Sequence, residues 1–351
     1  MTDYRRILII KPSSLGDVVH ALPTLAALRE RYPQAHIAWL VKREWAGLVE
    51  RAEGLDAVWP VEPGAMGWLS AVPRLRAPGF DLAIDLQGLL RSGAMAWLAG
   101  CPTRIGFANA REGSPLFYTH RVSVPTAEMH AVDRYLLVAA ACGAPAQGAP
   151  QFRLRPFPAD RQEVRILLSR HGVSPHEPWI GVNVAARWLT KRWPPESFAT
   201  TMDHLQEKGV GRVVLVGGPD DQAAAQAVKR LMRTMPVDLS GETAIGLLPA
   251  LLESAAVLLT NDSGPMHVAA AVGTPVVALF GPTSAVRTGP YGAGHQVLTN
   301  PVPCSPCFQR SCSNPIHLAC LTGIAPERVL AAVQEQLAKH PGLHALSAPL
   351  K

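Results

Sequence analysis

The feature that most constrains the fold is an alternation of short apolar segments with amphipathic segments of helical period. In the first 150 residues the apolar segments are residues 6–10, 36–41 and 81–85, and the helical segments are residues 17–31, 44–51 and 89–99. Strands that alternate with helices pair in parallel, because each helix returns the chain to the starting edge of the sheet. The alternation predicts an α/β unit with a parallel sheet covered by helices on both faces.

A second alternation follows an irregular stretch at residues 143–160, which contains four Pro and two Gly and reads as a linker. The later strand segments are residues 179–184, 212–216, 255–260 and 276–280, and the later helical segments are residues 195–208, 220–232, 266–272 and 326–338. The chain is therefore expected to form two doubly wound α/β domains. Ligands of such sheets bind at the carboxyl ends of the strands, so we expect a site in the cleft between the two domains.

The motif KPSSLGD, residues 11–17, joins the first strand to the first helix at that edge. Ser14 or Asp17 could simply cap the helix, since short polar side chains accept hydrogen bonds from free N–H groups there. A cap does not explain a small loop that ends in a carboxylate at the edge of a cleft. Asp17 is therefore also a candidate general base. Neither the dinucleotide fingerprint G-x-G-x-x-G nor the P-loop pattern occurs in the chain.

The motif NDSGPMH, residues 261–267, lies at the corresponding turn of the second half. Its Gly and polar residues at a helix N-terminus favour an anion site, because backbone N–H groups point at the ligand. Pro265 suits the first helical turn but cannot donate. A capped helix with His267 inside the core is the alternative, and it is the better interpretation of His267 alone.

Two further turns could contact a nucleotide. Lys191 and Arg192, in the sequence TKRWP, would suit a pyrophosphate, although taken alone this motif is better explained as a solvated turn anchored by Trp193. Asp220 and Asp221 follow a Gly-Gly-Pro turn and favour a helix N-terminus electrostatically. An acidic residue there could instead accept hydrogen bonds from ribose hydroxyls.

Four of the six cysteines lie within 17 residues, at Cys304, Cys307, Cys312 and Cys320. The spacing allows a structural four-cysteine zinc site, but the second pair is not of the C-x2-C type. Disulfides and free thiols that pack a loop are the alternatives. A structural role is expected in each case.

Together these motifs resemble the bacterial heptosyltransferases of glycosyltransferase family nine. The resemblance extends over nearly the whole chain and is carried by KPSSLGDVVHALPTL near the N-terminus, DLAIDLQGLLRS at 81–92, AREGSPLFYTHR at 110–121, TKRWPPESFA at 190–199 and TNDSGPMHVAAAVGTPVVALFGPT at 260–283. It implies a GT-B fold, in which two Rossmann-like domains with parallel sheets face a central cleft. The expected division is an acceptor-binding domain at 1–150, an ADP-sugar-binding domain at 151–325, and a C-terminal helix and tail at 326–351.

The resemblance also implies the reaction, an inverting transfer of L-glycero-D-manno-heptose from ADP-heptose to the inner core of lipopolysaccharide, without a catalytic metal. Asp17 would be the general base, and Lys191 would bind the donor phosphates. The other donor-binding residues would be Thr190, Asp221, Asp262, Ser263, Gly264, Met266 and His267. Acceptor binding is expected from Ser13, Ser14 and Gly16 of the first motif and from two arginines, Arg111 and Arg121. The acceptor sugar, Kdo or heptose, is left open, as is another nucleotide-sugar glycosyltransferase or an epimerase of the same fold.

The charge of +6 is uneven. Residues 1–170 hold 20 Lys and Arg against 15 Asp and Glu, a balance of 20 − 15 = +5, and 18 of the 20 are Arg. Arg binds carboxylates and phosphates in a bidentate way, so this half suits an anionic glycolipid of the Kdo-lipid A type, although an Arg-rich genome would give the same count. A nucleic-acid ligand is not expected, because there is no basic run and aromatic residues are only 6%.

No apolar stretch is long enough for a transmembrane helix. The first apolar run, residues 7–10, ends at Lys11, which does not fit a signal peptide. We therefore expect a cytoplasmic protein, acting peripherally at the inner face of the inner membrane.

Overall fold

The computed structural model describes residues 3–174 and 177–339 and divides the chain into two compact units, Met1–Arg155 and Pro156–Lys351. Each unit contains one six-stranded sheet, and every strand pairing in both sheets is parallel. The prediction of a two-part α/β fold with parallel sheets is confirmed. The predicted tail at 340–351 lies outside the described residues.

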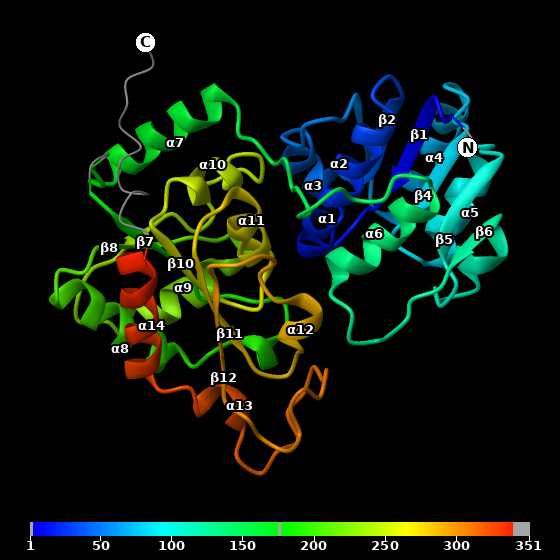
Figure 1. Ribbon diagram of the computed structural model, residues 1–351. Coiled ribbons are helices and arrows are strands. Elements are labelled where there is room, and N and C mark those ends of the chain that lie inside the picture. Colours follow the sequence, from blue (N-terminus) through cyan, green and yellow to red (C-terminus); the bar gives the residue numbers. More distant parts are fainter. Residues whose placement is uncertain (1–2, 175–176, 340–351) are drawn as a thin grey trace. The chain divides into compact units, whose positions relative to one another are not determined.

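Unit 1 has the strand order β3-β2-β1-β4-β5-β6. Its strands are β1 (Arg6–Ile10), β2 (His36–Lys42), β3 (Ala57–Val61), β4 (Leu82–Asp85), β5 (Thr103–Phe107) and β6 (His120–Val122). Its helices are α1 (Leu15–His20), α2 (Leu22–Arg31), α3 (Arg43–Val49), α4 (Gly64–Arg76), α5 (Leu90–Leu98), the 3-10 turn η1 (Ser114–Phe117) and α6 (Ala131–Ala141). The helices lie on both faces of the sheet (Figure 1).

Unit 2 has the order β12-β11-β10-β7-β8-β9. Its strands are β7 (Trp179–Asn183), β8 (Arg212–Leu215), β9 (Val237–Asp238), β10 (Val257–Asn261), β11 (Val276–Phe280) and β12 (Gln296–Thr299). Its helices and 3-10 turns are α7 (Pro158–Arg170), η2 (Leu189–Lys191), α8 (Pro195–Glu207), η3 (Pro219–Asp221), α9 (Gln222–Lys229), α10 (Leu248–Glu253), α11 (Gly264–Val272), α12 (Ala285–Thr288), α13 (Ala319–Thr322) and α14 (Pro326–Lys339).

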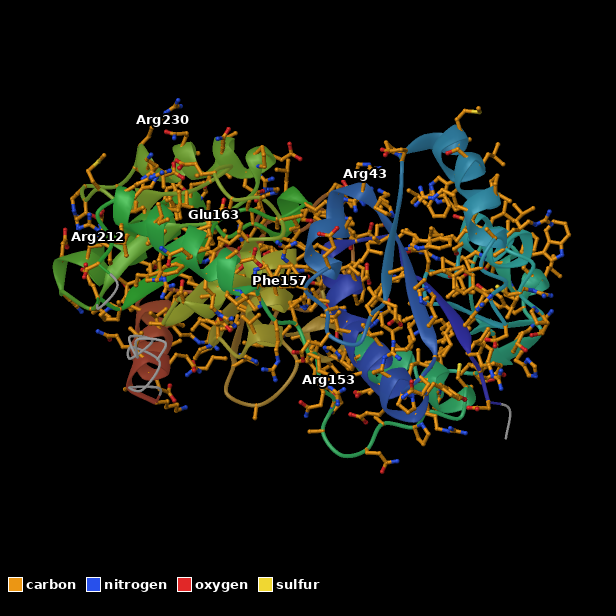
Figure 2. All side chains as sticks on the ribbon, turned by 90° about the horizontal axis from the view of Figure 1, so that it is seen from above. Arg43, Arg153, Phe157, Glu163, Arg212 and Arg230 are labelled. Carbon is orange, nitrogen blue, oxygen red and sulfur yellow. The ribbon has the colours of Figure 1, made fainter. Side chains whose placement is uncertain are left out.

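The interior of each unit is largely apolar, and most charged side chains project outward. Residues Ile7 to Ile10 of β1 are fully buried, as are Ile180 and Val182 of β7. Side chains fill the space between sheet and helices in both units, while labelled arginines such as Arg43 and Arg230 extend outward (Figure 2). Burial on both faces explains why the central strands are continuous apolar runs.

Three local expectations are wrong. The helix expected at 17–31 is two helices, α1 and α2, because Pro23 lies in the first turn of the second and has no N–H to continue the first. Helix α7 begins at Pro158, inside the stretch expected to be irregular. The helix expected at 220–232 is the turn η3 followed by the shorter α9. Within the described part of the chain, no helix is both long and apolar enough to cross a membrane.

Candidate active site

The first candidate region, here called the Asp17 loop, is residues 11–17 of unit 1: the loop between β1 and α1 and the first turn of α1, which carries Asp17. The Oδ2 atom of Asp17 accepts hydrogen bonds from the Ser14 backbone N–H at 3.1 Å and from the Ser14 hydroxyl at 2.8 Å. The capping interpretation of this motif is thus correct. The other oxygen, Oδ1, lies 3.4 Å from the Tyr135 hydroxyl. Both hydrogen bonds of the cap therefore go to Oδ2 of this half-buried side chain. The cap orients the Asp17 carboxylate and does not use its Oδ1 atom.

Lys11 and Tyr135 flank this carboxylate, and sequence reasoning missed both roles. Lys11 is only 3% exposed, and its ammonium lies 5.3 Å from the centre of the Tyr135 ring on α6. Burial opposes the charge of Lys11, but Asp17 and Tyr135 outweigh it, so the pKa of Lys11 is raised. Burial also raises the pKa of Tyr135. The available signal was a lysine that ends a fully apolar strand.

Behind this loop, Asp85 at the end of β4 is the centre of a buried hydrogen-bond network. Its Oδ1 accepts from the backbone N–H groups of Gln87 and Gly88, and its Oδ2 accepts from the hydroxyls of Ser92 at 2.8 Å and Tyr118 at 2.6 Å. Burial still raises the pKa of Asp85. The network fixes the loops that follow β4 and β5, so its role is to hold the edge of the sheet.

The predicted acceptor residues of unit 1 differ in their surroundings. Ser13 and Gly16 are half-buried in the Asp17 loop. Arg111 is exposed in the loop after β5, where its backbone N–H donates to the Gly88 carbonyl. Arg121 lies on the edge strand β6, and its Nε donates to the Pro115 carbonyl at 3.0 Å. Arg111 is therefore an exposed residue of a loop that follows the carboxyl end of β5, whereas Arg121 uses part of its guanidinium to support η1.

The second candidate region is at the carboxyl edge of unit 2, where Lys191 and Asp262 meet. The Lys191 ammonium lies 2.6 Å from Asp262 Oδ2, which also accepts a hydrogen bond from the Thr283 hydroxyl at 2.7 Å. The Asp262 side chain is 6% exposed and that of Lys191 18%. The expectation that TKRWP taken alone is a solvated turn is wrong for Lys191, because this carboxylate 71 residues away holds it. Trp193 is the buried anchor expected of it.

Two asparagines that sequence reasoning gave no role connect the loops of this edge. Asn261 accepts from the Trp193 backbone N–H at 2.9 Å and donates to the Val184 carbonyl at 3.0 Å. Asn183 donates to the Val216 carbonyl at 2.9 Å and accepts from the Ser263 hydroxyl at 3.1 Å. These bonds fix the Lys191 loop and the turn before α11 on adjacent strands.

The predicted donor residues of α11 contribute in different ways. Ser263 precedes the helix, and Gly264 begins it. Met266 is fully buried and His267 is 6% exposed, so both side chains belong to the interior, as the alternative interpretation of His267 had it. What remains at the surface is the helix N-terminus, where backbone N–H groups favour an anion.

Asp221 and Thr190 lie on the two neighbouring turns. Asp221 Oδ2 accepts from the Gly218 backbone N–H at 2.9 Å, so it caps the turn before α9. Burial raises the pKa of Asp221, against the opposing effect of this hydrogen bond and of Arg192. The hydroxyl of Thr190 is not at the surface: it donates to the Gln309 carbonyl at 2.9 Å, in the cysteine-containing segment.

The four clustered cysteines are free thiols that line one small cavity together with Thr190 and Gln309. Among the described residues, no group of three or more His, Cys, Asp or Glu side chains is arranged to hold a metal ion.

The two regions differ in which charged side chain, the lysine or the aspartate, is exposed to solvent. In unit 1 the lysine is buried and the carboxylate Asp17 is half-exposed. In unit 2 the carboxylate Asp262 is buried and the lysine is partly exposed. Unit 1 therefore offers a proton acceptor, and unit 2 offers a cation and helix N–H groups to an anion.

The comparisons with known proteins agree with one another. A model of glycosyltransferase family 9 (heptosyltransferase) matches residues 68–317. Lipopolysaccharide heptosyltransferase 2 of Escherichia coli (strain K12) is 31% identical over 308 residues, which cover 84% of this chain and 87% of that protein. The glycosyl transferase family 9 structure from Veillonella parvula DSM 2008 has a TM-score of 0.84 at 27% identity and covers 96% of this chain and 98% of that chain. The structure of E. coli ADP-heptose lps heptosyltransferase II has a TM-score of 0.81 at 27% identity, with coverages of 96% and 100%.

Proposed function

The chain belongs to glycosyltransferase family 9, the heptosyltransferases, and we propose that it transfers L-glycero-D-manno-heptose from ADP-heptose to an inner-core sugar of lipopolysaccharide. The observation that carries this proposal is the opposite exposure of the two Lys–Asp pairs. Asp17 is presented as a proton acceptor in one unit, and Lys191 is presented as a cation in the other. A base and an anion site are the two groups that sugar transfer from a nucleotide diphosphate requires.

In the proposed reaction, Asp17 takes the proton of the acceptor hydroxyl, and the acceptor oxygen forms a bond to the anomeric carbon of the heptose. The bond between that carbon and the β-phosphate oxygen breaks, and its electron pair leaves with ADP. Direct attack with one base gives inversion, because no covalent intermediate forms. Orientation of Asp17 by the two donors of Ser14 supports this role.

Negative charge builds on the β-phosphate as ADP leaves. We propose that Lys191 and the N–H groups at the start of α11 stabilise it without a metal. Asp221 would contact the adenosine, and Thr190 would hold the Lys191 loop. Asp262 would keep Lys191 in position and share it with the phosphate when the donor binds.

On this proposal unit 1 is the acceptor-binding domain, with Ser13, Ser14, Gly16, Arg111 and Arg121 as its contacts, and unit 2 is the ADP-sugar-binding domain. Unit 1, residues 1–155, holds 17 Lys and Arg against 13 Asp and Glu, a balance of 17 − 13 = +4, and unit 2 holds 16 against 14, a balance of 16 − 14 = +2. The larger excess of unit 1 supports this division, because the inner core and lipid A carry carboxylates and phosphates. Such an acceptor would bring the protein to the cytoplasmic face of the inner membrane as a peripheral enzyme.

The decisive test is mass spectrometry of products after the protein is incubated with ADP-heptose and defined Kdo-terminated or heptose-terminated acceptors. A mass increase of one heptose on either acceptor, with release of ADP, would establish the activity and identify the acceptor sugar. Parallel reactions with UDP-sugars test another glycosyltransferase, and a change in ADP-heptose without any acceptor would indicate an epimerase. Intact ADP-heptose and unmodified acceptors in all reactions would overturn the proposal.

A further inference from the structure

The indole of Trp188 in unit 2 lies between two cations that are far apart in the sequence. The Lys191 ammonium lies 4.8 Å from its ring centre, and the Arg310 guanidinium carbon lies 5.2 Å from it. Arg310 belongs to the cysteine-containing segment 304–320, which follows β12. The fold therefore places an arginine of that segment beside the lysine of the candidate anion site.

Hydrogen bonds of the two residues before Arg310 fix the backbone at this point. The preceding carbonyl, of Gln309, accepts the hydrogen bond from the buried Thr190 hydroxyl. The backbone N–H of Phe308 donates to the Pro282 carbonyl at 2.7 Å, directly before the Thr283 that holds Asp262. The segment is thus bonded to the Lys191 loop and to the loop that supplies Thr283, whose hydroxyl donates to Asp262. These bonds couple the position of Arg310 to the Lys191–Asp262 pair.

The two cations beside Trp188 differ in whether a carboxylate neutralises their charge. Lys191 is paired with Asp262 at 2.6 Å, so the pair as a whole is close to neutral. Arg310 is exposed and forms no ion pair with any of the described residues. Stacking on an aromatic ring leaves the N–H edge of a guanidinium free, and that edge matches two phosphate oxygens. A diphosphate that approached Lys191 would therefore still need a positive charge, and Arg310 can supply it.

We propose that Arg310 is a donor-binding residue that contacts the diphosphate of the nucleotide sugar beside Lys191. The inference rests on the proposed function of unit 2 as the ADP-sugar-binding unit and adds a residue to it. It also gives the cysteine-containing segment a purpose, which is to hold Arg310 against the Trp188 ring. The contact would strengthen as the leaving ADP gains charge, so Arg310 would act on turnover as well as on binding.

The test is calorimetric titration of ADP, AMP and adenosine into the wild-type protein, Arg310→Ala, Arg310→Lys and Arg230→Ala. Arg230 is the matched control, an exposed arginine of the same unit at the end of α9. Loss of charged hydrogen bonds to phosphate should weaken ADP binding by Arg310→Ala about tenfold or more. Adenosine binding should not change, and Arg310→Lys should recover part of the loss, because it keeps the charge without the fork.

The outcomes separate this inference from the proposed function. If the wild-type protein binds ADP and Arg310→Ala binds it within twofold, the inference is wrong and the function stands. Equal losses for ADP and adenosine would also overturn it, because they would indicate a general distortion. If the wild-type protein does not bind ADP, the proposed donor site is itself wrong and the inference fails with it. Unchanged thermal unfolding of Arg310→Ala confirms that the variant is folded.

Discussion

Both units place a lysine and an aspartate at the carboxyl edge of a parallel sheet, but they bury opposite members of the pair. Lys11 is enclosed in unit 1, and Asp17 remains half-exposed. Asp262 is enclosed in unit 2, and Lys191 remains partly exposed. In unit 2 the buried Asp262 holds Lys191 in an ion pair. In unit 1 the buried Lys11 and Asp17 attract each other electrostatically, while Ser14 orients Asp17. On the proposed function, the same pair of residue types thus supplies a base in one unit and an anion site in the other.

The largest effect is expected from Asp17→Asn, which removes the exposed carboxylate of unit 1. The amide can still accept from Ser14, so the helix cap is retained, but it cannot accept a proton. We expect transfer to fall about 10³-fold, within the range that general bases contribute, while ADP binding is unchanged. Measuring turnover and ADP affinity on one preparation checks both statements.

Ser14→Ala is the matched control for Asp17→Asn. It removes one of the two donors to Asp17 but keeps the carboxylate, so it should lower unit 1 stability by about 1 kcal/mol. Because Ser14 is also a proposed acceptor contact, the acceptor KM should rise, while kcat falls far less than in Asp17→Asn. A loss of activity equal to that of Asp17→Asn would mean that orientation, not basicity, is what the motif supplies.

Lys191→Ala removes the exposed charge of unit 2 and should have the next largest effect. It deletes the cation offered to the diphosphate and leaves Asp262 buried without it, so we expect a loss of transfer of about 10²-fold. In contrast to Asp17→Asn, ADP binding should weaken as well. Steady-state kinetics together with calorimetry of ADP distinguishes the two units. Wild-type ADP affinity in this variant would contradict the assignment of the anion site.

The double variant Lys191→Ala with Asp262→Asn sharpens this test. Removing the carboxylate charge should recover protein stability lost by Lys191→Ala, because a buried unpaired charge is costly. It should not recover ADP binding. Recovery of binding would show that Lys191 acts only by neutralising Asp262.

A smaller effect is expected from Lys11→Met, and it appears in the pH dependence of stability. The pKa of Lys11 is raised above its ordinary value of 10.5 in the folded protein. A raised folded-state pKa means that the stabilisation is complete below the unfolded-state pKa and is lost as pH rises through the folded-state pKa. The difference in unfolding free energy between wild type and Lys11→Met should therefore be constant up to about pH 10 and then shrink.

Urea unfolding of both proteins at a series of alkaline pH values measures this difference. The titrations of groups that do not interact with Lys11 occur in both proteins and cancel in the comparison, whereas Tyr135, whose pKa Lys11 lowers, titrates at different pH in the two proteins and is followed separately by its absorbance. A difference that stays constant through pH 11 and above would show that Lys11 gains nothing from Asp17 and Tyr135 in the folded state.

Structural features could be predicted from the sequence where one short segment contains all the interacting groups. The cap of α1, formed by Ser14 and Asp17, spans three residues, and the motif alone indicated that one of these two side chains could cap the helix. The central strands were also predictable, because burial on both faces makes them apolar throughout. Strands at the edges of the sheets, such as β6 and β9, were not predicted, because they are short and only partly buried.

The network of unit 2 could not be predicted from local patterns. The bond between Lys191 and Asp262 spans 71 residues, and the bond between Thr190 and Gln309 spans 119. Each residue taken alone fits an ordinary turn or cap. Only the order of strands in the sheet brings β7, β10 and β11 side by side and makes their loops one site. Tyr135 was missed in unit 1 for the same reason, since α6 is 118 residues from Asp17.

The smallest expected effect, from Thr190→Val, tests whether this long-range assembly matters. The substitution keeps the shape of the side chain but removes the hydrogen bond to Gln309, so Arg310 is held less firmly and ADP should bind about threefold more weakly. The matched control is Thr201→Val, which removes a similar buried hydroxyl bond, to the Ser197 carbonyl within α8, and should not change ADP affinity.

Because Thr190 acts through Arg310, the loss of ADP affinity caused by Arg310→Ala should be smaller in the Thr190→Val background than in wild type. Calorimetry of the four proteins of this cycle gives the coupling. Strict additivity would mean that the cysteine-containing segment and the Lys191 loop work independently, and unit 2 would then resemble unit 1 in needing only local contacts to present its charge.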